Sequence, residues 1–277
     1  MHKVLVIANQ TIAGRPVLEA VRRRHEADPD TRVIICVPRS TPTHGAVAYD
    51  DVLYDAAQIR VDLARRVLME EGIDAIGEVG DEDAYAATMD AVLEYEPDEI
   101  IISTLPGTLS GWQRRDLVER VEDASGLPVE HVEVDLDTEG VPFHVTLVVA
   151  ARTSSSEQLI GFLKDESRQR DKPELYILVV PKEGSSRLDA KAALGRLRQM
   201  RDALQTGGSS AAGMVGDPDP YTATMNALNY FRVDEVVIST LDATRSGWLR
   251  ADLVERVRKS TDKPVEHVVP DRAASAA

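Results

Sequence analysis

The chain has 277 residues and a single cysteine, so it is long enough for two domains that each bury a core, and it cannot form an internal disulfide. Its net charge of −15 would repel a phosphate backbone, so we expect no nucleic-acid partner, and no apolar run reaches the length that spans a membrane. The N-terminus enters an apolar strand without the features of a signal peptide, and together these observations predict a cytoplasmic protein with no membrane partner.

The first half of the chain alternates apolar runs rich in β-branched residues with amphipathic stretches. In chain order we expect a strand at Val4–Ala8, a helix at Val17–Glu26, a strand at Thr31–Pro38, a polar loop at Arg39–Tyr49, a helix at Asp50–Glu71, a strand at Ala75–Val79, a helix at Asp83–Tyr95, a strand at Glu99–Ser103, a helix from Gly111 to about Ala124, and a strand at Val129–Val134. Cys36 lies inside the second strand, where we expect a buried small side chain. Strands that alternate with helices predict a parallel sheet.

The second half follows the same order. We expect a strand at Val145–Ala150, a helix at Ser155–Arg168, a strand at Leu175–Val180, a helix at Ala190–Leu204 and a short strand near Ala212–Val215, followed by counterparts of the last four elements of the first half. The stretch Asp135–Val141 is polar and short, which is typical of a linker between closely held domains. We therefore place one domain at residues 1–137 and the other at 138–277.

A long internal repeat supports this division. The stretch Gly80–Asp135 aligns without gaps with Gly216–Asp271, a shift of 136 positions, and roughly 31 of the 56 positions are identical. Self-similarity at one fixed shift predicts two copies of the same structural unit. The predicted fold class is therefore α/β, with two tandem, open, Rossmann-like sandwiches of five mainly parallel strands each, related by a pseudo-twofold axis.

The loop after the fourth strand is the most informative candidate for a ligand site, because ligands of open α/β sheets bind beyond the carboxyl ends of the strands. Ser103–Gly111 consists mainly of small and hydroxyl residues and leads into a helix, whose free N–H groups favour an anion. The hydroxyls of Ser103, Thr104, Thr108 and Ser110 would add donors. The same residues also suit a tight turn with a helix cap, and on the loop alone the turn is the simpler interpretation.

Both halves of the chain resemble one domain of the universal stress protein family. The resemblance rests on the order of strands and helices, the glycine-containing loop after the fourth strand, Glu-Arg-Val on the next helix (Glu119–Val121 and Glu255–Val257), and Pro-Val at the start of the fifth strand (from Pro128 and from Pro264). Many members of that family bind ATP through an acid after the first strand and Gly-x2-Gly-x9-Gly-Ser/Thr after the fourth. The resemblance implies the α/β fold and raises an adenine nucleotide as the ligand.

This chain departs from that binding pattern. The acid is replaced by Asn9 in the first half and by Ala151 in the second, the first motif glycine by Thr104, and the Gly-Ser pair by Arg115-Asp116. These departures weaken the site, more so in the second domain. The loop and the resemblance together imply that the first domain holds ATP or AMP weakly, through Asn9, Thr11, Val37, Thr104, Gly107, Thr108, Ser110, Gly111 and Arg114.

A repeated Gly-Trp-x-Arg-x-Asp stands where the family's Gly-Ser pair is lost. Arg114 can bind a phosphate bidentately and Trp112 can cover a base or a ribose. Arg114 can equally pair with a surface acid while Trp112 anchors its helix, and we favour this structural interpretation slightly.

His131 and His267 stand in a repeated Pro-Val-Glu-His-Val. Neighbours on a strand point to opposite faces, so Glu130 and His131 cannot share a site by themselves, and packing or an interface is the favoured role for the histidines. The family often pairs domains through the fifth strand. We therefore expect Val129–Val132 to meet Val265–Val268 in antiparallel fashion, and a homodimer is a further option.

Two other polar groups are assigned structural roles. Asp81 and Asp83 can hold Mg²⁺ beside a phosphate, but helix capping explains both acids more simply. The run Arg22–Arg24 is expected to be a solvated helix face and not a basic patch. The other histidines, His2, His25, His44 and His144, are scattered, and none lies at metal-ligand spacing.

The expected role is a non-enzymatic, stress-associated binding or scaffold protein, without catalytic residues or a resident metal. Two alternatives remain open. One is slow, metal-dependent nucleotide hydrolysis, for which only Asp81, Asp83 or Asp116 could hold the metal or activate the water. The other is an assembly module whose loops serve only as turns.

Overall fold

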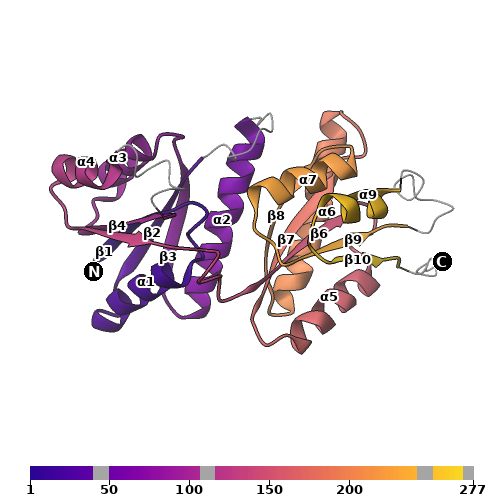
Figure 1. The fold of residues 1–277 in the computed structure, drawn as a ribbon, viewed down its shortest axis with the longest axis horizontal. Coiled ribbons are helices and arrows are strands. Elements are labelled where there is room, and N and C mark those ends of the chain that lie inside the picture. Colours follow the sequence, from indigo (N-terminus) through magenta and orange to yellow (C-terminus); the bar gives the residue numbers. More distant parts are fainter. Residues whose placement is uncertain (40–49, 107–115, 242–251, 271–277) are drawn as a thin grey trace. The chain divides into compact units, whose positions relative to one another are not determined.

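The chain forms two compact units, Met1–Pro142 and Phe143–Ala277, each built around its own sheet (Figure 1). The structure is a computed structural model that describes residues 1–39, 50–106, 116–241 and 252–270. Expectations that fall on the remaining residues, such as the loop within Arg39–Tyr49, lie outside the described part of the chain.

Unit 1 alternates strands and helices along its whole length. Its elements are β1 (Lys3–Ile7), α1 (Arg15–Ala27), β2 (Arg32–Pro38), α2 (Asp50–Glu70), β3 (Asp74–Gly80), α3 (Ala84–Tyr95), β4 (Glu99–Thr104), α4 (Leu117–Ser125) and β5 (Val129–Glu133). The strands pair in the order β3-β2-β1-β4-β5, and every pairing is parallel. The chain therefore moves outward from β1 in one direction and then returns to continue from β4 in the other.

Unit 2 repeats this architecture. Its elements are β6 (His144–Ala150), α5 (Glu157–Gln169), β7 (Glu174–Pro181), α6 (Arg187–Thr206), β8 (Ser210–Gly216), α7 (Pro220–Tyr230), β9 (Glu235–Ser239), α9 (Leu253–Ser260) and β10 (Val265–Val268). The order β8-β7-β6-β9-β10, again all parallel, matches that of unit 1 strand for strand. The predicted fold class, two tandem open α/β units of five strands, is confirmed.

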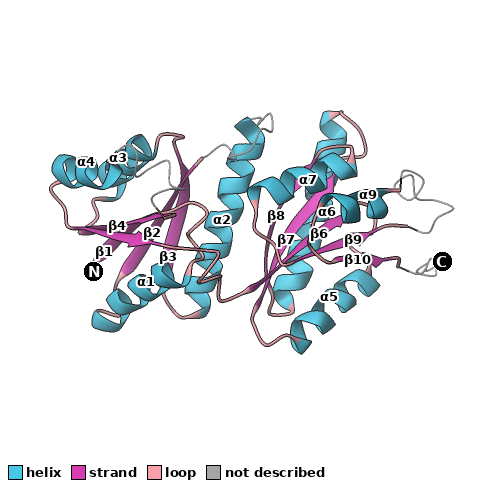
Figure 2. Cartoon of the chain, viewed as in Figure 1, coloured by secondary structure: helices cyan, strands magenta, loops and turns pink. Residues whose placement is uncertain are grey.

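Helices cover both faces of each sheet, which explains why the central strands are almost entirely apolar (Figure 2). In unit 1, alternate strand residues such as Leu5, Ile34 and Ile102 pack under α3 and α4. Cys36 belongs to this cluster and is fully buried, as expected. In unit 2, α5 and α6 cover a core that includes Val148 and Leu178.

The repeated Gly-Asp that opens each copy of the long repeat has a packing cause. A Cβ on Gly80 would lie 2.6 Å from Ala87 Cβ and 2.8 Å from Cys36 Sγ, and one on Gly216 would lie 2.8 Å from Ala223 Cβ. Only glycine lets α3 and α7 approach the sheet this closely.

Three predicted helices begin three or more residues from the expected start: α4, α6 and α9, of which α9, the counterpart of α4, begins at Leu253 after a left-handed Asp252. α6 begins at Arg187 rather than Ala190, because Ser186 and Asp189 form a reciprocal capping box three residues upstream of the apolar stripe. A helix running unbroken from Gly111 to Ala124 is excluded because Asp116 has left-handed backbone angles, with φ at 47°, so α4 begins only at Leu117. None of the described helices is both long and apolar enough to cross a lipid bilayer.

Candidate functional site

The carboxyl edge of the unit 1 sheet contains the point at which the strand order reverses. β1 lies between β2 and β4, and the loops that follow β1 and β4 leave in opposite directions. In open α/β sheets this arrangement forms a crevice that receives ligands. Four of the nine predicted site residues, Asn9, Thr11, Val37 and Thr104, are described by the structure and lie around this point.

Asn9 fastens the end of β1 to the end of β2. Its side chain is buried, and its Nδ2 donates a hydrogen bond to the Pro38 carbonyl oxygen. Val37, which precedes Pro38, is fully buried and contributes apolar contact only. In unit 2 the position of Asn9 is taken by Ala151, whose side chain cannot form this hydrogen bond.

Thr11 fastens the loop after β1 to the end of β4. Its Oγ1 donates to the Ser103 carbonyl oxygen at 3.4 Å, and the counterpart in unit 2, Thr153, donates to the Ser239 carbonyl oxygen at 3.1 Å. Both threonines are buried. Because this hydrogen bond is present in both units, we assign it to stabilising the fold at the carboxyl edge of each sheet.

The hydroxyls of Ser103 and Ser239 differ from their neighbours. Both side chains are buried, and neither Oγ has a hydrogen-bond partner among the described residues. A buried hydroxyl without a partner costs about 1–3 kcal/mol. Its presence at the switch point of both units marks these serines as the groups best placed to accept a partner from outside the described chain.

Thr104 pairs with His131, a contact that the sequence analysis did not anticipate. Thr104 Oγ1 lies 2.9 Å from His131 Nε2, and Thr240 Oγ1 lies 2.8 Å from His267 Nε2 in unit 2. The histidines were assigned to packing or an interface because their neighbours on the strand point away. The signal that could have found the pair is the 27-residue spacing of threonine and histidine, which both copies keep.

The environment of the two histidines is not the same. His131 is exposed, whereas His267 is half-buried. Burial, together with the nearby charge of Arg258, lowers the pKa of His267 below its ordinary value. The Thr240–His267 pair therefore favours a neutral imidazole.

The remaining five predicted site residues lie outside the described part of the chain. They are Gly107, Thr108, Ser110, Gly111 and Arg114. The interpretations offered for Trp112 fall there too.

The repeated acids after the third strands act as expected for helix caps. Asp83 accepts hydrogen bonds from the backbone N–H groups of Tyr85 and Ala86, and Asp81 accepts one from that of Asp83. Asp219 caps α7 in the same way, through Thr222 N–H. No cluster of three or more potential metal ligands occurs among the described residues.

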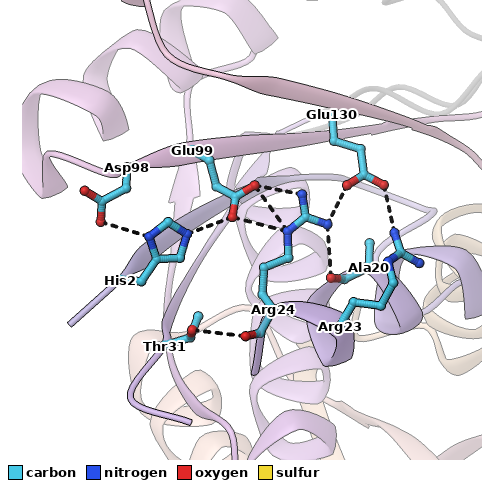
Figure 3. Close-up of polar contacts among 8 residues, drawn as sticks. All are labelled: His2, Ala20, Arg23, Arg24, Thr31, Asp98, Glu99 and Glu130. Atoms are coloured by element: carbon cyan, nitrogen blue, oxygen red, sulfur yellow. Dashed lines mark hydrogen bonds and ion pairs between the residues drawn. The ribbon is translucent and has the colours of Figure 1, made fainter. Parts of the chain in front are cut away.

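The opposite, amino-terminal edge of the unit 1 sheet carries a network of ion pairs (Figure 3). Arg24 binds Glu99 with Nη2–Oε2 at 2.7 Å and also binds Glu130, which Arg23 contacts at 2.9 Å. Arg22, which is paired with Glu71, and Arg23 keep solvent-accessible side chains, as expected of a solvated helix face. Arg24 departs from that expectation, because its side chain is only 17% exposed and contacts two acids.

His2 belongs to this network. Its imidazole lies 2.8 Å from Glu99 and 3.5 Å from Asp98. Burial opposes ionisation of Glu99, but the hydrogen bonds from Arg24 and His2 outweigh it and hold the pKa of Glu99 below its ordinary value.

The same arrangement recurs in unit 2. His144 lies 3.8 Å from Asp234 and 3.5 Å from Glu235, so His2 and His144 occupy equivalent places in the two units. The position at the start of each sheet and the engaged partners assign both histidines to the scaffold.

Comparison with known proteins found similarity among solved structures alone. No family model matches the chain, and no curated protein matches it. Among solved structures, the chain is similar to a universal stress protein from Archaeoglobus fulgidus DSM 4304, with 13% sequence identity and a TM-score of 0.34, over 97% of this chain and 96% of that one. A TM-score of 0.34 is too low to establish a shared fold. The α/β assignment therefore depends on the strand order and register of this chain.

Proposed function

We propose that the chain is a non-enzymatic, cytoplasmic binding protein of the universal stress type, and that unit 1 weakly holds an adenine nucleotide, ATP or AMP, at the carboxyl edge of its sheet. The observation that carries this proposal is the switch point between β1 and β4, with the buried, unpartnered Ser103 hydroxyl beside it. The side-chain groups of Asn9, Thr11 and Thr104 that hold this wall are engaged with the protein itself. Weak binding follows, because few donors remain for a ligand.

The test is a calorimetric titration of the full chain with ATP and with AMP, each carried to millimolar concentration. Ser103→Ala removes the unpartnered hydroxyl at almost no structural cost, and we expect it to weaken nucleotide binding about tenfold. Ser239→Ala is the matched control, since it removes the equivalent hydroxyl in unit 2 and should leave the affinity unchanged. The absence of both heat and a thermal shift in the parent chain would refute the proposal.

A phosphate-release assay with Mg²⁺ or Mn²⁺ distinguishes binding from hydrolysis. We expect release to equal that of a protein-free blank, because Asp83 is occupied as a helix cap and Asp81 accepts a backbone N–H group. Release above the blank that is abolished by Asp116→Asn would favour the hydrolase instead.

The proposal includes pairing of the fifth strands, β5 with β10. Each is the outermost strand of its sheet, next to β4 and β9 respectively. An exposed strand edge offers unpaired N–H and C=O groups to another strand. The same edges are available to a second copy of the chain, which makes a homodimer the alternative assembly.

A further inference from the structure

Unit 2 contains a groove far from its switch point. The groove lies where α7 and α9 end, next to the segments that lead into β9 and β10, and has a volume of about 570 Å³. α7 and α9, whose ends supply most of its lining, pack against each other. Its lining combines apolar and polar side chains: Met225, Leu228, Asn229, Phe231, Val233, Lys259, Ser260, Thr261, Asp262 and Lys263. A volume of this size suits a small organic ligand.

The apolar part of the lining comes from the segment around the end of α7. Phe231 and Val233 are buried at its base, and Met225 and Leu228 are half-buried beside them. This part can accept a hydrocarbon or an aromatic body.

The cationic part of the lining comes from Lys259 and Lys263. Neither ammonium group forms an ion pair or a side-chain hydrogen bond with a described residue. Arg258, by contrast, is engaged with Glu255 at 2.9 Å and with the Val265 carbonyl oxygen. Both ammonium groups that line the groove are therefore available to bind an anionic ligand.

The equivalent place in unit 1 is built differently. Lys259 corresponds to Asp123 and Lys263 corresponds to Leu127 at the shift of 136 positions. Leu127 packs against the apolar core of unit 1 together with Val92 and Tyr95. Unit 2 thus has Lys263 where unit 1 has the packed Leu127, and Lys259 where unit 1 has Asp123. These two differences give the groove of unit 2 a cationic rim that unit 1 lacks.

The charge of the whole units follows the same trend. Met1–Pro142 contains 13 basic and 29 acidic residues, a net charge of −16, while Phe143–Ala277 contains 19 basic and 18 acidic residues, a net charge of +1. An anion is therefore not repelled by the background charge of unit 2 as it is by that of unit 1.

Helix stabilisation accounts for only part of this pattern. The carbonyl ends of α7 and α9 carry partial negative charge, and Lys259, in the last turn of α9, can offset it. Lys263 lies three residues beyond the end of that helix, and Thr261 and Asp262 separate it from the last turn. Its position in the lining of a groove that is part apolar and part polar is not explained by the helix end.

From these observations we infer that the groove binds an amphipathic organic anion, with its apolar body on Phe231 and Val233 and its carboxylate or phosphate between Lys259 and Lys263. This site is separate from the proposed nucleotide crevice, which lies at the carboxyl edge of the sheet in unit 1.

The inference is tested by titrating the full-length chain with octanoate, octyl phosphate and neutral 1-octanol while recording backbone amide NMR shifts. We expect both anions to shift amides of residues 228–233 and 259–263, and octanol to bind at least about tenfold more weakly. The tighter of the two anions identifies the head group. Equal binding of octanol, or shifts confined to other parts of the chain, would overturn the inference.

Variants that carry the unit 1 residues give the sharper test. Lys259→Asp and Lys263→Leu should each weaken octanoate binding about threefold at low salt, and together about tenfold. Lys191→Asp, an equal charge change at an exposed position of α6, is the control and should leave the affinity unchanged. A double variant that melts at a lower temperature but binds octanoate as the parent does would show that the lysines serve only the helix end, and would refute the site.

Discussion

Glu174 shows how one side chain can work against the stability of its own unit. It is buried at the start of β7, accepts a hydrogen bond from Thr146 Oγ1 and lies 3.1 Å from Arg170, but Arg170 also binds Glu235. With Glu166 at 3.5 Å as well, three carboxylates thus share one guanidinium. Burial raises the pKa of Glu174 to about 7, and the nearby charge of Glu235 adds to the effect.

The raised pKa makes the stability of unit 2 depend on pH. Between about pH 4.5 and pH 7 the folded state keeps a proton on Glu174 that the unfolded state has lost, so this group's contribution to stability falls as the pH rises through that window. We expect Glu174→Gln to stabilise the protein by about 2 kcal/mol at pH 8 and to have little effect at pH 4.5. Urea unfolding at both pH values measures the difference, with Glu166→Gln, at a more exposed partner of Arg170, as the control. Equal effects at the two pH values would contradict the assignment.

Individual polar contacts were the hardest feature to predict from the sequence. The partners of His2 lie 96 and 97 residues away, and those of Arg24 lie 75 and 106 residues away, so no local pattern announces them. Capping is local, and Asp83 was accordingly predicted correctly from its place before an apolar helix. A pair of residues kept in both copies is the better guide to such a distant contact, as Thr104 with His131 and Thr240 with His267 show.

At the scale of elements, close packing between helix and sheet decides which glycines are required. Gly80 lies at the end of β3 against α3, where an added methyl group would overlap Ala87 and Cys36, whereas Gly195 lies within α6 and an added Cβ there meets no atom within 4 Å. Gly80 is therefore required for close packing of α3 on the sheet, whereas Gly195 is not required for packing.

This difference predicts opposite effects for the same substitution. Gly80→Ala should destabilise the protein by about 1–3 kcal/mol because the core of unit 1 must shift to accept the methyl group. Gly195→Ala should stabilise it by about 1 kcal/mol because alanine favours a helix interior. Chemical denaturation of both variants beside the parent chain measures the two effects. A neutral Gly80→Ala variant would show that α3 is free to move outward.

Helices and strands were predictable where the spacing of apolar residues and the residues that begin or end the element agree. The central strands, such as β1, β2 and β7, carry runs of buried aliphatic residues, so their existence and their order along the chain were predicted correctly. The beginnings of α4 and α6 were not, because the first depends on the left-handed backbone of Asp116 and the second on a side-chain capping box.

At the scale of the whole molecule, the outer edges of β5 and β10 are the feature on which the proposed pairing depends. The N–H of Val134 and the C=O of Pro128 bind β4, so the N–H and C=O of His131 point to the free edge of the sheet. In β10 the C=O groups of Pro264 and Val268 bind β9. Because alternate residues of a strand direct their N–H and C=O groups to opposite sides, the N–H and C=O of His267 point to the free edge of the second sheet.

Strand pairing predicts slow amide exchange at these two histidines. If β5 meets β10, the amides of His131 and His267 are protected, and His131→Pro, which removes one outward N–H, should expose His267 to exchange. His131→Ala is the control, because it also removes the imidazole that contacts Thr104 but keeps the N–H. Hydrogen exchange followed by NMR reads out both. Free exchange of the two amides in the parent chain would rule the pairing out, and protection that disappears on dilution would assign it to a second copy.

The domain pattern was accessible from the sequence because duplication leaves a repeat that is visible without coordinates. The chemistry of the crevice was less accessible, because the nucleotide hypothesis draws on a resemblance from which this chain departs at Asn9 and Thr104. The unpartnered serines became visible only through their burial.

The unequal charge of the two units has a consequence for their behaviour when separated. Mutual repulsion between copies keeps a protein dispersed, and it weakens as the net charge approaches zero. A fragment limited to Phe143–Ala277, with a net charge of +1, would stand close to its isoelectric condition at neutral pH. Proteolysis between the units would therefore yield one fragment that stays dispersed and one that tends to precipitate, so that the acidic unit acts as the solubilising partner of the other.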